Sequence, residues 1–208
     1  GHAVRRELIY VFVAELLIVV AFASAPLFIV ENYLFNVAGY GVMSIALIYI
    51  IGGAMGSLSA FFYDRLRRKS SETLLYGAIM SFSVSSAMIY LSPMMPLTLA
   101  VILASLAIWY FFGSIWGIIH GAVVMSLVPE DLRGTIFGTV TMAERLIIIP
   151  LPLVAALVAT RSPLAPYLIQ SALFLTTIPL YRAAFSSIKK NIRGAEEGFS
   201  KQLVPQKV

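Results

Sequence analysis

The sequence contains no cysteine and very few charged residues. Without cysteine the chain has neither disulfides nor thiolate ligands for a metal. Charged residues make up 12% of the 208 residues, against roughly 25% in a soluble domain. Hydrophobic residues make up 60%, and a water-soluble fold would have to leave much of that apolar surface exposed. This composition is typical of a protein whose solvent is lipid.

Six apolar segments are long enough to cross a bilayer as helices, which takes about 20 residues each. The segments are Leu8–Val30, Val42–Phe62, Leu74–Leu91, Leu97–Leu127, Thr135–Val158 and Pro166–Phe185. Their hydrophobic runs are continuous and do not alternate as the strands of a membrane barrel must. The sequence therefore predicts an all-α membrane protein with six transmembrane helices in one bundle over residues 3–188.

The net charge of +5 comes from basic residues at the ends of these segments, not from a patch that would bind nucleic acid. The connections 31–33, 92–96 and 161–163 carry one basic residue, Arg161, and nearly all the others lie at the opposite ends. Basic loops stay in the cytoplasm. We therefore expect both termini in the cytoplasm and a multi-pass protein of the cytoplasmic membrane.

The two ends of the chain lie outside this bundle. Gly1 and His2 match the remnant of an expression tag and have no place in a functional argument. Residues 189–208 are rich in Lys, Glu and Gly, and we expect a polar, solvated and unstructured cytoplasmic tail.

Two of the connections on the basic side carry more specific patterns. The loop after the second segment reads GSLSAFFYDRLRRK from Gly56 to Lys69, and the loop after the fourth reads VPEDLRGTIFG from Val128 to Gly138. The arginines could serve only to fix topology, and the glycines only to let helices pack closely.

Together these loops resemble the signature loops of the major facilitator superfamily. In that family a Gly followed by Asp-Arg and further basic residues joins the second and third helices, and a Pro-Glu-x-x-Arg-Gly pattern joins the fourth and fifth. Leu66-Arg67 stands where a glycine typically follows Asp-Arg. The resemblance implies that these residues form cytoplasmic gate motifs: Gly56, Asp64, Arg65, Arg68, Glu130, Arg133, Gly134 and Gly138. In such a gate Arg65 or Arg68 would pair with Glu130 or Asp131.

The resemblance covers residues 5–185 and corresponds to half of a twelve-helix transporter. It implies two inverted three-helix repeats and secondary transport of a small solute, as a symporter or antiporter, by alternating access. The chain lacks the Gly-Pro pattern of many fifth helices and the arginine of many fourth helices in amino-terminal halves, so it is most similar to a carboxy-terminal half. The second half would lie upstream in the same chain, in a second copy or in a separate subunit.

Four ionisable residues lie at membrane depth, where charge is costly and usually functional: Glu15, His120, Glu144 and Arg145. They occupy the first, fourth and fifth segments. In the resembled family the first and fourth helices line the central cavity, the second and fifth flank it, and the third and sixth face lipid. The resemblance therefore implies that these charges line or flank a cavity.

The fourth segment carries an aromatic stripe. Trp109, Gly113, Trp116 and His120 fall within about 40° of one another on a helix. We interpret the tryptophans, with Tyr110, as candidates for a substrate cavity wall, and His120 as a group that titrates near neutral pH. The alternative is packed aromatic rings and a histidine bonded to a backbone carbonyl. Gly113, Gly117 and Gly121 predict close helix packing on an adjacent face.

Glu144 and Arg145 are adjacent, so their side chains point about 100° apart and each needs its own partner. Depth and charge make Glu15 the expected partner of Arg145. Glu144 then becomes a candidate for proton coupling, or a carboxylate in a water-filled vestibule.

Two other functions compete with transport. A six-helix subunit for membrane interaction or assembly would move no solute, but it would not need a charged and aromatic interior. An intramembrane enzyme would need a catalytic constellation, and the sequence has no His-Glu-x-x-His pattern and no cysteine nucleophile. We therefore expect no enzymatic activity, no cofactor and no metal.

Overall fold

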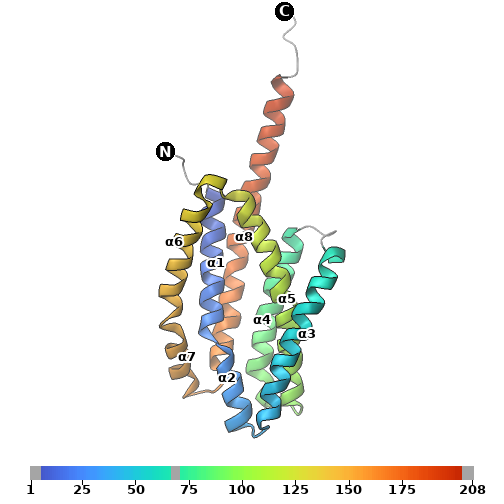
Figure 1. Cartoon of the computed structure of the whole chain (residues 1–208), viewed down its shortest axis with the longest axis vertical. Helices are drawn as coiled ribbons and strands as arrows, with labels where there is room; N and C mark the ends of the chain where they lie inside the picture. Colours follow the sequence, from blue (N-terminus) through green and yellow to red (C-terminus); the bar gives the residue numbers. More distant parts are fainter. Residues whose placement is uncertain (1–5, 67–70, 203–208) are drawn as a thin grey trace, which may run out of the picture.

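The structure, a computed structural model, describes residues 6–66 and 71–202, which contain helices and no strands. Eight α-helices follow one another along this part of the chain (Figure 1). They are α1 (Arg6–Ser24), α2 (Leu27–Asn32), α3 (Val42–Leu66), α4 (Ser71–Leu91), α5 (Thr98–Leu127), α6 (Arg133–Ile148), α7 (Leu151–Ala159) and α8 (Ala165–Gln202).

Six helical segments are long and apolar enough to cross a membrane, as the sequence predicts. The first segment combines α1 and α2 and continues to Val37 through a short π-helix, Tyr33–Val37. The expected connection at residues 31–33 is therefore wrong, because those residues are helical. The chain turns instead at Gly39 and Gly41, whose φ of 72° favours glycine.

Prolines divide two of the spans. Pro26 separates α1 from α2, and Pro150 separates α6 from α7. Proline cannot donate the amide hydrogen that the helix ladder requires, and its ring clashes with the preceding turn. Both spans are therefore interrupted at a proline.

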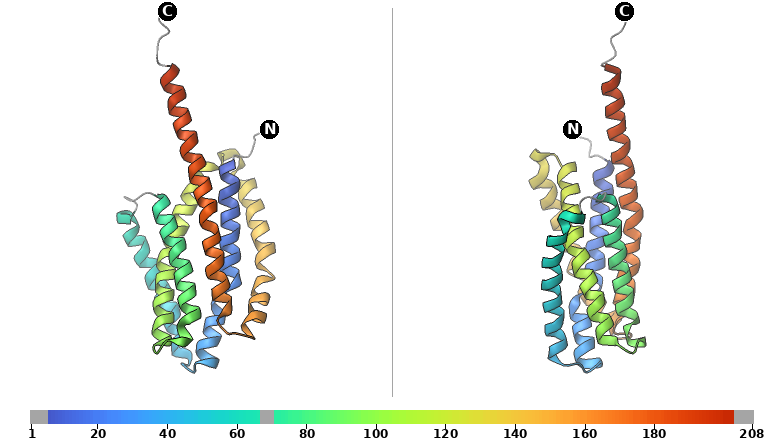
Figure 2. Two further views of the ribbon diagram at one scale, coloured as in Figure 1. Left: turned by 180° about the vertical axis from the view of Figure 1, so that it is seen from behind. Right: turned by 90° about the vertical axis from the view of Figure 1, so that its right-hand side faces the viewer.

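The helices form a bundle whose two edges are α3 and α6–α7 (Figure 1; Figure 2, left). Helix α5 lies between these edges on the face turned toward the viewer of Figure 1, and α4 and α8 lie behind it (Figure 2, right). Helix α8 packs along both α1 and α4, and α5 packs along both α3 and α4. The core of the bundle therefore lies among α1, α4, α5 and α8.

Burial differs sharply between the spans. Half of the most apolar stretch of α4 is buried (50%), against 11% in α3 and 6% in the span made by α6 and α7. Within the core, Ile18, Phe82, Ile115 and Phe174 are fully buried. The two edges of the bundle thus bury few of their side chains.

Helix α8 is much longer than one membrane thickness. Its 38 residues extend about 57 Å, against about 30 Å for the hydrocarbon core of a bilayer. Its carboxy-terminal part projects beyond the bundle, at the end where α1 begins (Figures 1 and 2). The expected unstructured tail is therefore helical as far as Gln202.

Candidate functional site

Glu15, His120 and Tyr181 meet inside the bundle, from α1, α5 and α8. His120 Nε2 lies 3.2 Å from Glu15 Oε1, and the two side chains are 6% and 21% exposed. The His120 Nδ1 atom lies 2.9 Å from the Tyr181 hydroxyl, which is fully buried. When the Tyr181 hydroxyl donates to Nδ1, a neutral His120 carries its proton on Nε2, the ring nitrogen that lies near Glu15.

Three buried atoms of this cluster have no hydrogen-bond partner among the described residues. They are Glu15 Oε2, Trp116 Nε1 and His120 Nε2. The Glu15–His120 contact is itself close enough for an ion pair but not aligned as a hydrogen bond. Unsatisfied polar atoms are costly in an apolar interior, and the cluster therefore has unused capacity to bind a ligand or a proton.

Trp116 stacks face to face on the His120 ring. The ring centroids are 4.8 Å apart and the planes are inclined by 11°. The two residues are four positions apart on α5, so they lie one above the other on the same face. The stack fixes the plane of the imidazole ring beside Glu15.

Phe22 of α1 is the centre of an aromatic cluster that includes both tryptophans. Its ring centroid lies 5.2 Å from that of Trp109, 6.2 Å from that of Trp116, 5.4 Å from that of Phe82 and 5.3 Å from that of Phe174. All four contacts are edge to face, the geometry that aromatic quadrupoles favour. Both tryptophans of the predicted stripe are thus packed on α1, and each remains partly exposed.

Tyr110 belongs to a different part of the bundle. Its ring lies against α3, where a side chain on Gly52 would come within 3.1 Å of it. Tyr110 also lines a small cavity of about 40 Å³ with Trp109, Tyr167 and Gln170. The structure therefore separates Tyr110 from the Glu15–His120 pair.

Glu144 of α6 brings a second carboxyl group near the cluster, whereas Arg145 forms no ion pair with it. Glu144 is half-buried and lies within electrostatic range of Glu15, Arg145 and His120, with no hydrogen bond or ion pair to them among the described residues. Arg145 is exposed, and no described residue forms an ion pair with it. The expected Glu15–Arg145 pair is therefore replaced by Glu15–His120, because α5 turns His120 toward α1.

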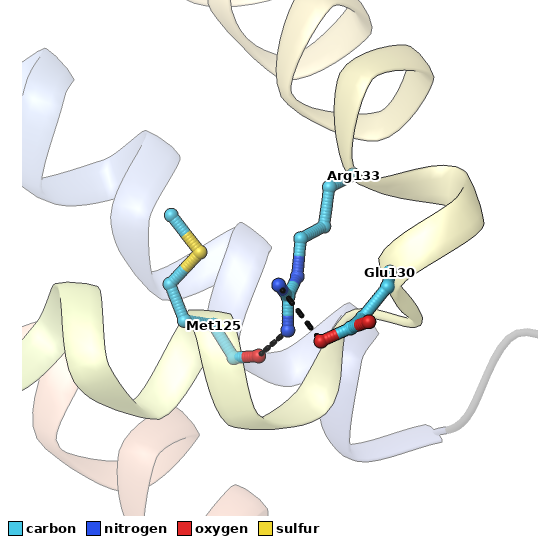
Figure 3. Close-up of polar contacts among 3 residues, drawn as sticks. All are labelled: Met125, Glu130 and Arg133. Atoms are coloured by element: carbon cyan, nitrogen blue, oxygen red, sulfur yellow. Dashed lines mark hydrogen bonds and ion pairs between the residues drawn. The ribbon is translucent and has the colours of Figure 1, made fainter.

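The predicted gate residues of the α5–α6 connection form a compact local structure (Figure 3). Arg133 Nη2 donates to the Met125 carbonyl in the last turn of α5 at 3.2 Å, and Arg133 Nη1 lies 3.4 Å from Glu130 Oε1. The guanidinium thus neutralises the negative end of the α5 dipole. Side chains added at Gly134 and Gly138 would meet no atom within 4 Å, so these glycines are not packing positions among the described residues.

The other predicted gate loop is described only in part. Arg65 is exposed and lies 5.9 Å from the centroid of the Phe62 ring. The side chain of Asp64 and the whole of Arg68 fall outside the described residues. Glu130 pairs with Arg133, and no ion pair of Arg65 with Glu130 or Asp131 occurs in the part of the chain described. Gly56 faces Ser114 of α5 at ordinary contact distance.

Sequence reasoning missed Tyr181 and a polar network between α4 and α8. Ser83 Oγ lies 2.9 Å from Ser171 Oγ, and Ser86 Oγ donates to Gln170 Oε1 at 2.8 Å. A glutamine in an apolar span is costly unless its amide forms hydrogen bonds. Gln170 could therefore have been recognised from the sequence as a residue that needs polar partners on a neighbouring helix. Tyr181 gave no comparable signal, because tyrosine is ordinary in membrane helices.

No protein-family model matches the chain, and comparison with curated proteins and with solved structures gave no significant match. The resemblance to the major facilitator superfamily therefore rests on the two loop motifs and remains an expectation.

Proposed function

We propose that this chain is one half of a two-lobed secondary transporter of the cytoplasmic membrane. It would move a small solute by alternating access, with its proton-binding groups in the Glu15–His120–Glu144 cluster. The observation that carries the proposal is this cluster itself: Glu15 contacts His120 at membrane depth, with Glu144 nearby and partly exposed tryptophans beside them. Ionisable groups are rarely kept at such depth without a role in a substrate or ion pathway.

The exposure of the bundle's edges is an argument for a second lobe that packs against them. The span of α6 and α7 is the least buried of the six, yet it carries the exposed Arg145. An apolar face can contact lipid, but a guanidinium at this depth needs water or a partner carboxylate. A second bundle across α3 and α6, with an aqueous cavity before α1 and α5, provides that environment. This arrangement also follows from the family resemblance and its inverted repeats.

The orientation of the chain is part of the same proposal. The amino-terminal end of α1, the carboxy-terminal end of α8 and the α5–α6 connection lie at one end of the bundle (Figure 1). The positive-inside rule assigns that end to the cytoplasm. Arg133 would then hold the cytoplasmic gate motif together by bridging Glu130 and the end of α5.

Thiol labelling can test the aqueous cavity directly, because the chain has no cysteine of its own. Thr141 is exposed on α6, one turn from Arg145, and Val84 is exposed on the outer face of α4. In native membrane vesicles we expect a membrane-impermeant maleimide to label Thr141→Cys and to leave Val84→Cys unlabelled. Alternating access further requires labelling of Thr141→Cys from either side of the membrane.

The labelling result also distinguishes a transporter from a six-helix assembly subunit. If Thr141→Cys and Val84→Cys are equally unreactive, α6 faces lipid or a tight protein contact. The chain would then be a six-helix assembly subunit that moves no solute.

A further inference from the structure

The most unusual feature of the cluster is the free carboxylate oxygen of Glu15. Oε1 contacts His120, whereas Oε2 has no hydrogen-bond partner among the described residues. Both oxygens belong to a side chain that keeps 21% of its surface exposed, on the helix that borders α6. A ligand that approaches from this side would meet the partly exposed Glu15 side chain. The partnerless Oε2 atom is itself buried, so contact with it requires a neighbouring side chain to move aside.

Aromatic rings continue from this carboxylate along the bundle. Phe22 lies seven residues after Glu15, about 10 Å along the same face of α1. Trp116 stacks on His120 and contacts Phe22, and Trp109 contacts Phe22 from the next turns of α5. We call these four side chains, Glu15, Phe22, Trp109 and Trp116, the acidic aromatic wall. It offers one charge at one end and apolar ring surface over the rest.

The ionisable side chains around Glu15 come from three other helices. His120 of α5 touches it, Glu144 of α6 adds a second carboxylate, and Tyr181 of α8 holds His120 by a hydrogen bond. Arg145 of α6 is exposed on the outer side of its helix. The Glu15 carboxylate thus contacts one imidazole, with a second carboxyl group nearby, and the Glu15–His120 pair is negative when Glu15 is ionised and His120 is neutral.

We propose that the acidic aromatic wall binds a lipophilic organic cation in competition with a proton. This inference rests on the proposed transport function and names its substrate class. With a proton, His120 is an imidazolium that neutralises Glu15. Without the proton, the Glu15 carboxylate is free to pair with the cation, whose apolar groups lie on the rings. One cation and one proton therefore exchange for each other.

Other substrate classes fit this wall less well. An anion would have to approach the Glu15 carboxylate, and like charges in a desolvated site are strongly unfavourable. A sugar needs several hydrogen-bonding groups around its ring, whereas the wall offers one carboxylate and two indole N–H groups. A cation with aromatic substituents uses both the charge and the ring faces.

The two tryptophans of the chain, Trp109 and Trp116, both belong to the wall, so intrinsic fluorescence reports on it without a label. Tetraphenylphosphonium and tetraphenylborate have nearly the same size and shape and opposite charge. We would titrate each into the assembled transporter in lipid nanodiscs. Tetraphenylphosphonium should quench the fluorescence saturably, and tetraphenylborate should not.

The variants separate charge recognition from proton competition. Glu15→Gln should weaken tetraphenylphosphonium binding by about tenfold or more, and Glu31→Gln, at the outer end of the first span, should leave it unchanged. In the unmodified protein the Kd should rise by about tenfold per pH unit on the acidic side of the transition. His120→Gln should keep cation binding and lose this pH dependence, which a purely structural histidine would not explain.

Two results would overturn the proposal: equal binding of tetraphenylphosphonium to the unmodified protein and to Glu15→Gln, or tighter binding of tetraphenylborate. Circular dichroism and particle size show whether Glu15→Gln is folded, and His120→Gln tests the site independently of that variant. Failure here would leave alternating access intact, because labelling at Thr141 measures the cavity without any assumption about substrate.

Discussion

Gln170 of α8 donates a hydrogen bond from Nε2 to the carbonyl oxygen of Ala21 in α1, over 3.0 Å and across 149 positions of sequence. Its Oε1 atom accepts from Ser86 of α4 at 2.8 Å. Ala21 lies in the last turn of α1, just before the break at Pro26, and also accepts from Ser24 Oγ at 2.8 Å. One amide therefore joins three helices at the point where the first span is interrupted.

Replacing Gln170 with leucine should destabilise the bundle by about 1–2 kcal/mol, because the Ser86 hydroxyl and the Ala21 carbonyl both lose a buried partner. Thr176→Val is the matched control, since the Thr176 hydroxyl is exposed and bonds only within α8. Thermal unfolding in detergent would measure both variants. Equal melting temperatures for the two variants would show that the amide does not hold the helices together.

Gly52 and Gly53 provide a second matched pair on α3. A side chain at Gly52 would lie 3.1 Å from the Tyr110 ring, whereas one at Gly53 would meet no atom within 4 Å. We expect Gly52→Val to cost about 1–3 kcal/mol through displacement of Tyr110, and Gly53→Val to cost much less. Unfolding of both variants by a denaturant would compare them, and similar losses would contradict the close α3–α5 contact.

Arg133 should contribute more to the stability of the fold than its ionic partner Glu130. The Arg133–Glu130 pair is exposed, so Glu130→Ala should change stability by less than about 0.5 kcal/mol. Arg133→Ala also removes the bond to the Met125 carbonyl and should cost about 1 kcal/mol. Melting temperatures of the two variants would decide this. Equal losses would assign the stabilisation to the ion pair rather than to the end of α5.

Glu144 and the Glu15–His120 pair should have separable roles. Glu144 lies on the α6 side of the pair, where it can pass protons between the pair and the proposed cavity. Glu144→Gln should therefore abolish the dependence of uptake on an imposed pH gradient in proteoliposomes. It should change the equilibrium affinity for tetraphenylphosphonium by less than about threefold, because Glu15 remains. Unchanged pH-driven uptake would remove Glu144 from the coupling mechanism.

The transmembrane segments were largely predictable because length and hydropathy alone decide whether a helix spans a bilayer. The error at Glu31–Tyr33 arose where three polar or aromatic residues looked like a connection. Their helix continues through the π-helical turn to Val37, and the chain reverses only at two glycines. Polar residues near a membrane surface fit a loop and a helix end equally well, so composition did not distinguish them.

The partners of the buried charges were harder to predict than their depth. Depth follows from counting residues, whereas a contact also depends on how each helix is rotated and which helices are neighbours. Arg145 and His120 lie at similar depth, and only the packing of α5 against α1 and α8 selects His120 for Glu15. Likewise Gly113 meets Phe82, while Gly117 and Gly121 meet nothing within 4 Å in the described bundle.

Helix α8 extends from the buried cluster, where it carries Tyr181, to a part of the chain beyond the membrane-spanning segment. The residue that contacts His120, Tyr181, and the distal residue Gln202 belong to one uninterrupted helix. The 14 residues beyond Ile188 are about 21 Å long, so a tilt of about 10° in the membrane would move the tip by about 4 Å. Any tilt of α8 that begins at the contact between Tyr181 and His120 would therefore be amplified at the distal end of the helix.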